Sequence, residues 1–220
     1  MDKIDTYDAV VIGGGPAGAT AAHEMARQGR SVLLLDRDGR IKPCGGAIPP
    51  RLIKDFAIPD HLLVARIRCA RMIAPSDAKV DIPIEGGFVG MVDRGPFDEW
   101  LRERAAQAGA VRTRGSFEAI ERDVDGSAIV RFSSRGRRGG EAVPVRVKAR
   151  VVVGADGARS EVARQEVPGS DRGKFVFAYH EILRAPVDRA GYDGTRCDVV
   201  YNGEYSPDFL KGNFKLEVHE

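Results

Sequence analysis

Three glycines near the N-terminus have the spacing of a phosphate-binding turn. Gly13, Gly15 and Gly18 form a G-x-G-x-x-G pattern that also contains Pro16 and Ala17. In such a pattern the first glycine permits a tight turn, the second lets a pyrophosphate approach the backbone, and the third lets a helix pack closely on a strand. The spacing therefore predicts that residues 13–18 bind the pyrophosphate of a dinucleotide.

An acidic residue follows at the distance that ribose recognition requires. Asp36, which is followed by Arg37, ends the second apolar run of the chain. A carboxylate there can accept hydrogen bonds from both hydroxyls of an adenosine ribose, and it disfavours the 2′-phosphate of NADP. The two features together favour FAD or NAD, and a Gly-rich turn of some other α/β protein is the plainer alternative.

A second motif could contact the same cofactor. The apolar residues 151–153 lead into the sequence GADGARS, which contains Asp156 and Gly157. We expect a backbone turn near the cofactor, with Asp156 hydrogen-bonded to a polar cofactor group; a simple Asp-Gly turn is the alternative. Arg94 is expected at the end of a strand, just before a helix, where functional residues often lie.

A cysteine lies in a loop that could also approach a ligand. Residues 41–50, IKPCGGAIPP, are too rich in glycine and proline to form regular structure for long. Cys44 and Gly45 would place a thiol on a backbone that can approach another group closely. A plain connection with one buried cysteine is the alternative interpretation.

The hydrophobic pattern predicts the elements that would position these residues. Residues 9–12 and 31–35 are short, β-branched or leucine-rich runs typical of buried parallel strands. The small apolar residues after Gly18 predict a helix that Gly29 ends. A short helix is expected over residues 50–56, with Pro50 at its start, and a longer one over 96–108. Strands are expected over 66–74, 79–84, 88–92, 117–122, 127–133, 143–150, 174–183 and 195–201.

Composition gives no sign of a charged partner. The 220 residues are 43% hydrophobic and 30% charged, and 34 basic against 32 acidic residues leave a net charge of +2, so no nucleic-acid partner is expected. Cys44, Cys69 and Cys197 are odd in number and unevenly spaced, which indicates neither a disulfide framework nor a metal site. We expect a cytoplasmic protein whose membrane contacts, if it has any, are peripheral.

These motifs, in this order, resemble the superfamily of FAD-dependent hydroxylases and reductases. The motifs are the glycine pattern, Asp36, the R-x-x-F-D-x-x-L pattern of residues 94–101, and GADGARS. The stretches KPCGGAIP (42–49), FVFAYHE (175–181) and YDGTRCD (192–198) are more narrowly similar to the geranylgeranyl reductases of chlorophyll and bacteriochlorophyll synthesis. The resemblance covers about residues 5–209.

The resemblance implies an α/β fold in which a Rossmann-type FAD-binding domain is interrupted by a mainly antiparallel sheet of a substrate domain. We expect the FAD-binding domain at residues 1–65 and 88–168, part of the substrate domain at 66–87 and 169–209, and a divergent tail at 210–220. The family pattern P-x-x-Y-x-W-x-F-P is altered there, because Leu210, Gly212 and Lys215 replace its Tyr, Trp and final Pro. The third flavin motif of the family would follow Glu220, so the chain is expected to be cut short and to bind FAD poorly alone.

The family also implies a reaction, the saturation of C=C bonds that converts a geranylgeranyl chain to phytyl. The glycine pattern and Asp36 would hold the ADP half of FAD, and Arg94 and Asp156 would hold the flavin half. Cys44 would lie beside the isoalloxazine ring and the prenyl pocket as a candidate proton donor. NADPH would dock transiently as the reductant, which agrees with the single glycine pattern.

Three functions remain open at this point. The first is a prenyl reductase, acting on a free diphosphate or on a pigment-esterified chain, in contact with photosynthetic membranes. The second is an aromatic monooxygenase on the same scaffold, against which the KPCGG sequence argues. The third is a non-catalytic chain that only binds part of FAD. The oligomeric state is not indicated.

Overall fold

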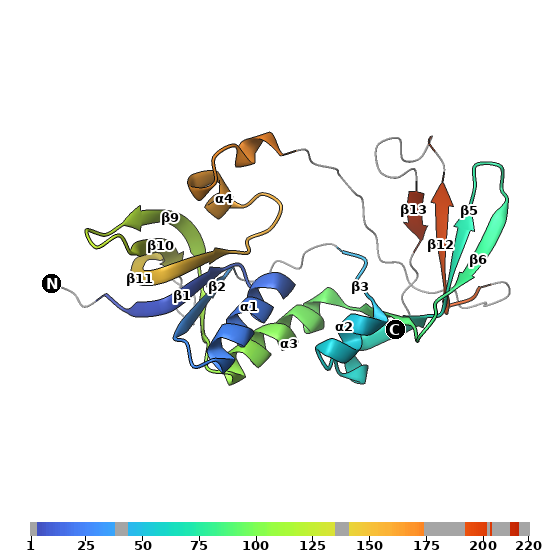
Figure 1. The fold of residues 1–220 in the computed structure, drawn as a ribbon, viewed down its shortest axis with the longest axis horizontal. Coiled ribbons are helices and arrows are strands. Elements are labelled where there is room, and N and C mark those ends of the chain that lie inside the picture. Colours follow the sequence, from blue (N-terminus) through green and yellow to red (C-terminus); the bar gives the residue numbers. More distant parts are fainter. Residues whose placement is uncertain are drawn as a thin grey trace. The chain divides into compact units, whose positions relative to one another are not determined.

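The computed structural model describes residues 4–37, 44–134, 141–173, 192–201 and 203, and the backbone of 212–215 (Figure 1). The chain forms two compact units. The first comprises Met1–Ile41 and Asp98–Gly173, and the second comprises Lys42–Phe97 and Lys174–Glu220. The domain limits expected from the sequence stay a prediction. The strand expected over residues 174–183 and the FVFAYHE stretch lie outside the described residues.

A six-stranded sheet forms the centre of the first unit, in the order β8-β2-β1-β11-β10-β9. Its strands are β1 (Thr6–Ile12), β2 (Val32–Asp36), β8 (Val111–Arg114), β9 (Ser116–Arg122), β10 (Ala128–Ser134) and β11 (Val143–Gly154). Strands β8, β2, β1 and the end of β11 run parallel, whereas β9, β10 and the start of β11 form an antiparallel meander. This arrangement confirms the expected α/β class with a Rossmann-type nucleotide-binding sheet.

Strand β11 joins the two parts of this sheet. It pairs antiparallel with β10 from Val143 to Ala149, and parallel with β1 from Lys148 to Gly154. The sheet bends along this strand (Figure 1). The core between the parallel strands and the meander consists of residues from β1, β2, β10, β11 and a short helix, namely Val10, Ile12, Leu33, Leu35, Ala128, Val130, Phe132, Val147, Ala149 and Val162.

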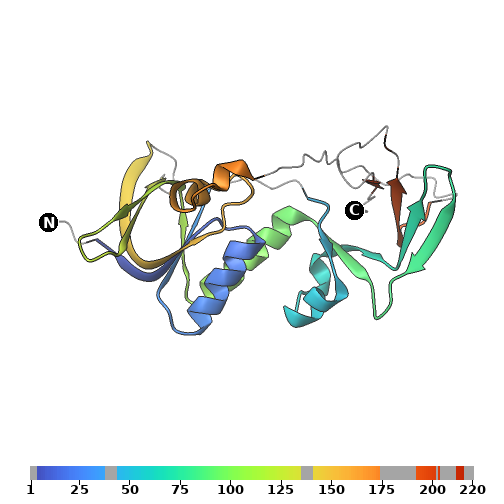
Figure 2. The ribbon, with the colours of Figure 1, turned by 45° about the horizontal axis from the view of Figure 1, so that its top comes forward.

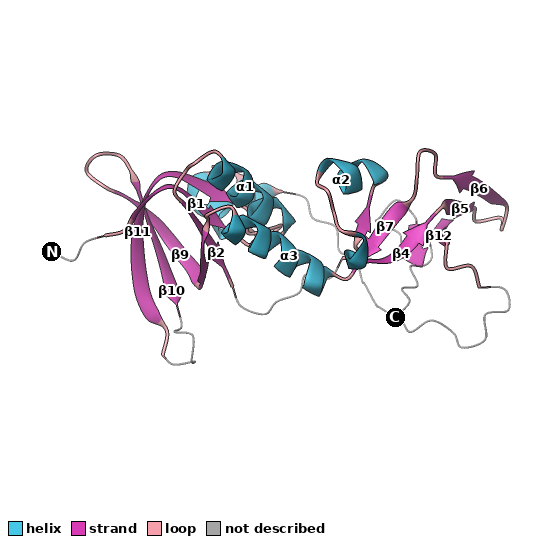
Figure 3. Cartoon of the chain, turned by 90° about the horizontal axis from the view of Figure 1, so that it is seen from below, coloured by secondary structure: helices cyan, strands magenta, loops and turns pink. Residues whose placement is uncertain are grey.

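Two helices lie together beside the parallel strands, α1 (Pro16–Arg27) and α3 (Arg94–Gln107) (Figures 2 and 3). Helix α1 buries the small residues Ala19, Ala22 and Ala26, which let it pack closely. The Nδ1 atom of His23 lies 3.1 Å from the main-chain oxygen of Arg104 on α3. Because a carbonyl only accepts, the imidazole carries its proton on Nδ1 in this contact.

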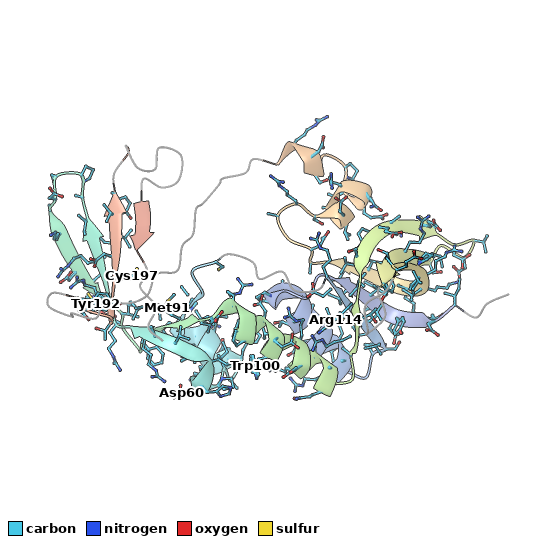
Figure 4. All side chains as sticks on the ribbon, turned by 180° about the vertical axis from the view of Figure 1, so that it is seen from behind. Asp60, Met91, Trp100, Arg114, Tyr192 and Cys197 are labelled. Carbon is cyan, nitrogen blue, oxygen red and sulfur yellow. The ribbon has the colours of Figure 1, made fainter. Side chains whose placement is uncertain are left out.

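Helix α3 begins two residues earlier than the sequence predicts. Its start, Arg94–Phe97, belongs to the second unit and the rest belongs to the first. Leu101 and Ala105 are buried, as expected for one apolar face. Trp100 is only half-buried, and its ring faces the guanidinium of Arg104 at 5.5 Å (Trp100 is labelled in Figure 4).

The second unit contains two small sheets. One is three-stranded in the order β3-β7-β4, and the other has the order β13-β12-β5-β6. The elements are β3 (Ala47–Ile48), α2 (Pro50–Asp55), η1 (Asp60–Leu62), β4 (Leu63–Ile67), β5 (Cys69–Ile73), β6 (Lys79–Pro83), β7 (Val89–Val92), β12 (Arg196–Tyr201) and β13 (Gly212–Lys215). Only the β12–β5 pair is parallel among the described pairs of these sheets, so they are mainly antiparallel.

The single strand expected over residues 66–74 is wrong. Two strands, β4 and β5, replace it, and they belong to different sheets. The chain changes sheet at Arg68, whose amide donates to the carbonyl oxygen of Thr195 at 2.7 Å. A partner more than a hundred residues away thus ends a run that looks continuous in the sequence.

Candidate functional site

The turn between β1 and α1, which we call the glycine turn (residues 13–18), is tightly packed. Gly13 has a φ of +106°, and its amide donates to the carbonyl oxygen of Leu35 at 2.8 Å. A Cβ on Gly13 would lie 2.3 Å from the carbonyl oxygen of Ala155, and one on Gly18 would lie 1.8 Å from that of Gly13. The protein's own backbone therefore requires glycine at both positions.

Gly15 differs from these two glycines, because it faces open space. A Cβ on Gly15 would meet no protein atom within 4 Å. Gly15 is the N-cap of α1, Pro16 occupies the first helical turn, and no side chain caps the helix. Backbone N–H groups at a helix start attract phosphate, and they gain from the helix dipole. The residues present thus fit a pyrophosphate, since Gly15 leaves the room that its approach needs.

Asp36 lies beside this turn, at the end of β2. A Cβ on Gly14 would stand 2.6 Å from Asp36 Cγ, so the carboxylate packs directly against the turn. The Asp36 side chain is 29% exposed. The structure therefore brings the glycine pattern and the predicted ribose acceptor together at the end of the parallel strands, where α/β sheets usually bind ligands. Arg37 follows and is exposed.

An arginine that the sequence analysis missed joins these two features. Arg102 on α3 donates from Nη1 to the carbonyl oxygen of Gly14 at 3.2 Å, and the same atom lies 3.4 Å from Asp36 Oδ2. Glu99 holds the other side of the guanidinium, with Arg102 Nε 3.0 Å from Glu99 Oε2. Arg112 on β8 also donates to Glu99, at 2.8 Å. We call these five residues the Arg102 network: Gly14, Asp36, Glu99, Arg102 and Arg112.

Charge pairing in the Arg102 network changes the acidity of its glutamate. The pKa of Glu99 lies below its usual value, first because of the hydrogen bond from Arg112 and then because of the one from Arg102. Glu99 therefore stays ionised when the solution becomes mildly acidic. The only sequence signal for this network is the i, i+3 spacing of Glu99 and Arg102 on a predicted helix.

The second motif contacts the first through its backbone. The amide of Ala155 donates to the carbonyl oxygen of Ile12 at 2.8 Å, and the Ala155 carbonyl faces Gly13. The expected turn at residues 154–157 thus lies next to the glycine turn. Gly157, at the end of this turn, has a φ of +94°.

The carboxylate of Asp156 is used by the following helix, α4 (Glu161–Glu166). Its Oδ1 accepts from Ser160 Oγ at 2.5 Å, and its Oδ2 accepts from the amides of Glu161 at 2.7 Å and Val162 at 3.3 Å. Ser160 in turn caps the helix by accepting from the amide of Ala163. Asp156 therefore has a structural role that the sequence analysis did not assign, and the expected contact with a cofactor stays a prediction.

Three predicted site residues lie in the second unit and are described there by themselves. Cys44 is exposed, so the burial expected for it under the alternative interpretation is wrong. Whether its loop is a plain connection stays a prediction. Gly45 is half-buried and lies between Cys44 and the start of β3. Arg94 is half-buried and is the first residue of α3, not the end of a strand.

The three cysteines are free thiols in different environments. Cys44 is exposed, whereas Cys69 and Cys197 are half-buried on adjacent strands (Cys197 is labelled in Figure 4). Burial raises the pKa of the Cys197 thiol. Within the described ranges, no helix is both long and apolar enough to cross a membrane.

Comparison with known proteins shows which family this chain belongs to. Residues 7–181 match the family described as "Pyridine nucleotide-disulphide oxidoreductase". The chain is 62% identical to the "Geranylgeranyl diphosphate reductase" of Rhodobacter capsulatus over 92% of its own length and 50% of that protein. It is 38% identical to the chloroplastic "Geranylgeranyl diphosphate reductase" of Oryza sativa subsp. japonica, over 90% of this chain and 44% of that protein.

A solved structure has the same fold. A "geranylgeranyl bacteriochlorophyll reductase-like" protein from Thermoplasma acidophilum matches with a TM-score of 0.70 at 24% identity, over 90% of this chain and 51% of that one. The chain spans about half the length of the curated relatives that it matches. The resemblance to geranylgeranyl reductases is confirmed, and the comparisons do not favour an aromatic monooxygenase or a non-catalytic chain.

Proposed function

We propose, from the premise that this chain belongs to the pyridine nucleotide-disulphide oxidoreductase family, that it binds FAD and takes part in reducing the C=C bonds of a geranylgeranyl chain. One observation carries the proposal. The open space at Gly15 lies in a turn whose neighbouring residue, Gly14, packs against the Asp36 carboxylate. A phosphate site and a ribose acceptor side by side suit a dinucleotide.

The residues of the first unit would divide the ADP half of FAD between them. The pyrophosphate would lie over Gly15, where the first N–H groups of α1 can donate to it. The ribose hydroxyls would donate to Asp36, because a carboxylate can accept from both. Gly13 and Gly18 would keep the turn narrow without touching the ligand, since protein atoms fill the space above them.

The flavin supplies the two-electron chemistry that saturation of a C=C bond requires. The protein's part is to hold the cofactor, orient the alkene and exclude water. Cys44 is the proposed proton donor, because it is an exposed thiol in a loop that we propose lies near the flavin, as the resemblance to the family implies. The resemblance to the family also leads us to propose cofactor contacts for four further residues, namely Arg37, Gly45, Arg94 and Gly157.

NADPH is the proposed reductant, docking transiently. Asp36 disfavours a 2′-phosphate, so NADPH would not use the glycine turn. The proposed substrate is a geranylgeranyl chain, because two relatives are named for geranylgeranyl diphosphate. Whether the chain is reduced as a free diphosphate or as a pigment ester is decided by assaying both. Peripheral contact with a photosynthetic membrane fits a substrate with a long apolar tail.

Flavin titration tests the proposal directly. Purified chain is titrated into FAD while flavin fluorescence is followed, and ADP is added as a competitor. Because the chain spans about half the length of its relatives, we expect weak but saturable binding that ADP reverses, and absence of binding would refute the proposal. Reduction is then assayed with NADPH and, in separate reactions, geranylgeranyl diphosphate and a geranylgeranyl pigment ester, and mass spectrometry counts the hydrogens gained. The control is protein saturated with AMP, in which the adenosine site is blocked.

A further inference from the structure

We propose that Arg102 is the positioning residue of the adenosine end of this site. In this inference, one guanidinium fixes both the Asp36 carboxylate and the Gly14 peptide before the dinucleotide arrives. It rests on the proposed function, since it takes the glycine turn as the place where a dinucleotide binds. Arg102 would act through Asp36 and Gly14 and would not contact the reacting atoms.

The geometry of the guanidinium supports this role. Arg102 Nη1 reaches both Gly14 O, at 3.2 Å, and Asp36 Oδ2, at 3.4 Å. A guanidinium is planar and presents its donors in a rigid fork, so one group that contacts two partners restrains both. The Arg102 side chain is only 20% exposed, which strengthens its pairing relative to a contact in open solvent.

The contact with Gly14 has a consequence for Gly15. The peptide between these residues is planar and trans, so the Gly14 carbonyl and the Gly15 N–H point in opposite directions. Holding the carbonyl toward Arg102 therefore turns the Gly15 N–H away from α3. The direction of a donor at the open position of the turn is thus set by a residue of another helix.

The contact with Asp36 has a second consequence. The arginine uses Oδ2, and a carboxylate has further lone pairs that can accept from ribose hydroxyls. The pairing removes rotational freedom from Asp36 without using its full capacity as an acceptor. Binding of a ligand to a carboxylate that is already held in place costs less side-chain conformational entropy.

The guanidinium is itself held in place by the rest of the network. Glu99 accepts from Arg102 Nε at 3.0 Å and from Arg112 Nη1 at 2.8 Å. Arg112 lies on β8, which pairs with β2, the strand that ends in Asp36. The network therefore connects α3 to the sheet at the edge where the ribose acceptor lies.

Substitution of Arg102 tests the inference. Arg102→Gln removes the charge and the fork, and Arg102→Lys keeps the charge but cannot bridge both partners in the same way. Arg27→Gln is the matched control, because Arg27 is an exposed arginine in the last turn of α1. FAD and ADP affinities are measured for each protein by titration, and thermal unfolding of the ligand-free proteins reports whether they fold.

We expect Arg102→Gln to weaken both FAD and ADP by about tenfold, which corresponds to loss of a charge-assisted hydrogen bond. Arg102→Lys should fall between this variant and the wild type, and Arg27→Gln should bind as the wild type does. Combining Arg102→Gln with Asp36→Asn should cost less than the sum of the two single changes, because both act through one carboxylate.

Two results would overturn the inference. One is a folded Arg102→Gln protein that binds ADP within about twofold of the wild type; the other is full additivity with Asp36→Asn. If Arg102→Gln does not fold, Arg102→Lys decides in its place: wild-type ADP affinity overturns the inference, and weakened affinity supports it. Failure of the wild type itself to bind FAD would instead refute the proposed function, so the two failures are distinguishable.

Discussion

Gly14 lies against the carboxylate of Asp36 so closely that a Cβ on Gly14 would stand 2.6 Å from both Cγ and Oδ2 of that side chain. Gly14 is a variable position of the G-x-G-x-x-G pattern, and the pattern alone gives no reason for a third consecutive glycine. The contact supplies the reason, since a larger residue would displace the ribose acceptor.

This contact predicts the effect of Gly14→Ala. The added methyl should push the Asp36 carboxylate away from its place beside the turn. FAD should then bind about tenfold or more weakly, as we also expect for Asp36→Ala, because in both variants a charged hydrogen bond worth roughly 1.5–3 kcal/mol is lost. FAD titration of the two variants and of the double variant measures this. Wild-type affinity in Asp36→Ala would remove that residue from the site.

Gly15→Ala and Gly18→Ala should separate ligand binding from folding. An alanine at position 15 meets no protein atom, so we expect only the small fall in unfolding temperature that a poorer N-cap residue causes. FAD should bind more weakly, because the methyl occupies the space left for the pyrophosphate. An alanine at position 18 would clash with the backbone of Gly13 and should lower the unfolding temperature. Equal FAD affinity of Gly15→Ala and the wild type would mean that no ligand approaches there.

Asp156→Ala should destabilise the protein by about 1–2 kcal/mol, the usual cost of losing a helix cap. Ser160→Ala is the matched control, because it removes the cap hydroxyl of α4 and leaves Asp156 in place. Denaturant unfolding gives both stabilities, and FAD titration separates the two roles of Asp156. We expect only Asp156→Ala to weaken FAD binding. Equal affinities in the two variants would make Asp156 purely structural.

Cys44 should be the first thiol to react with a disulfide reagent such as DTNB. It is exposed, whereas Cys197 is half-buried with a raised pKa and should react slowest, since the thiolate is the reactive form. Stopped-flow absorbance should show one fast phase that Cys44→Ser abolishes. Saturating FAD should slow this phase because the loop is proposed to lie beside the flavin; an unchanged rate would argue for a remote loop.

Glu99 should contribute stability that depends on pH. Its pKa is lowered in the folded protein, so the contribution is present above the unfolded-state pKa of about 4.3 and is lost as the pH falls through the folded value. Because Glu99 is 41% exposed, the effect should stay below about 1 kcal/mol. Glu99→Gln should unfold with a shallower dependence on pH between about 5 and 3, as measured by denaturant titration. Identical dependence in both proteins would contradict the pairing.

The local parts of this structure could be predicted from the sequence. The strand, turn and helix at the N-terminus follow from apolar runs, glycine spacing and a helix stop at Gly29, all of which are properties of neighbouring residues. Strand β8 was missed because VRTR is short, has two charged residues and lies at a sheet edge.

The parts that depend on distant residues could not be predicted in this way. The role of Arg102 arises because α3 and the end of β2 meet in space, and no spacing within either segment encodes this. The capping role of Asp156 was hidden because a cap and a cofactor ligand need the same carboxylate. The KPCGG and GADG motifs identified the family well, but they did not reveal which atoms already have partners.

Because β11 pairs with both β10 and β1, it restricts where residues can be inserted into or deleted from this sequence. A residue inserted near Lys148, where the strand passes from β10 to β1, would turn every later side chain of β11 to the opposite face. The carbonyl of Ala155 would then no longer face Gly13, and the two motifs would lose their contact. Insertions and deletions should therefore be tolerated at the turn of residues 123–127 but not in β11. Strand β11 keeps the meander in register with the glycine turn.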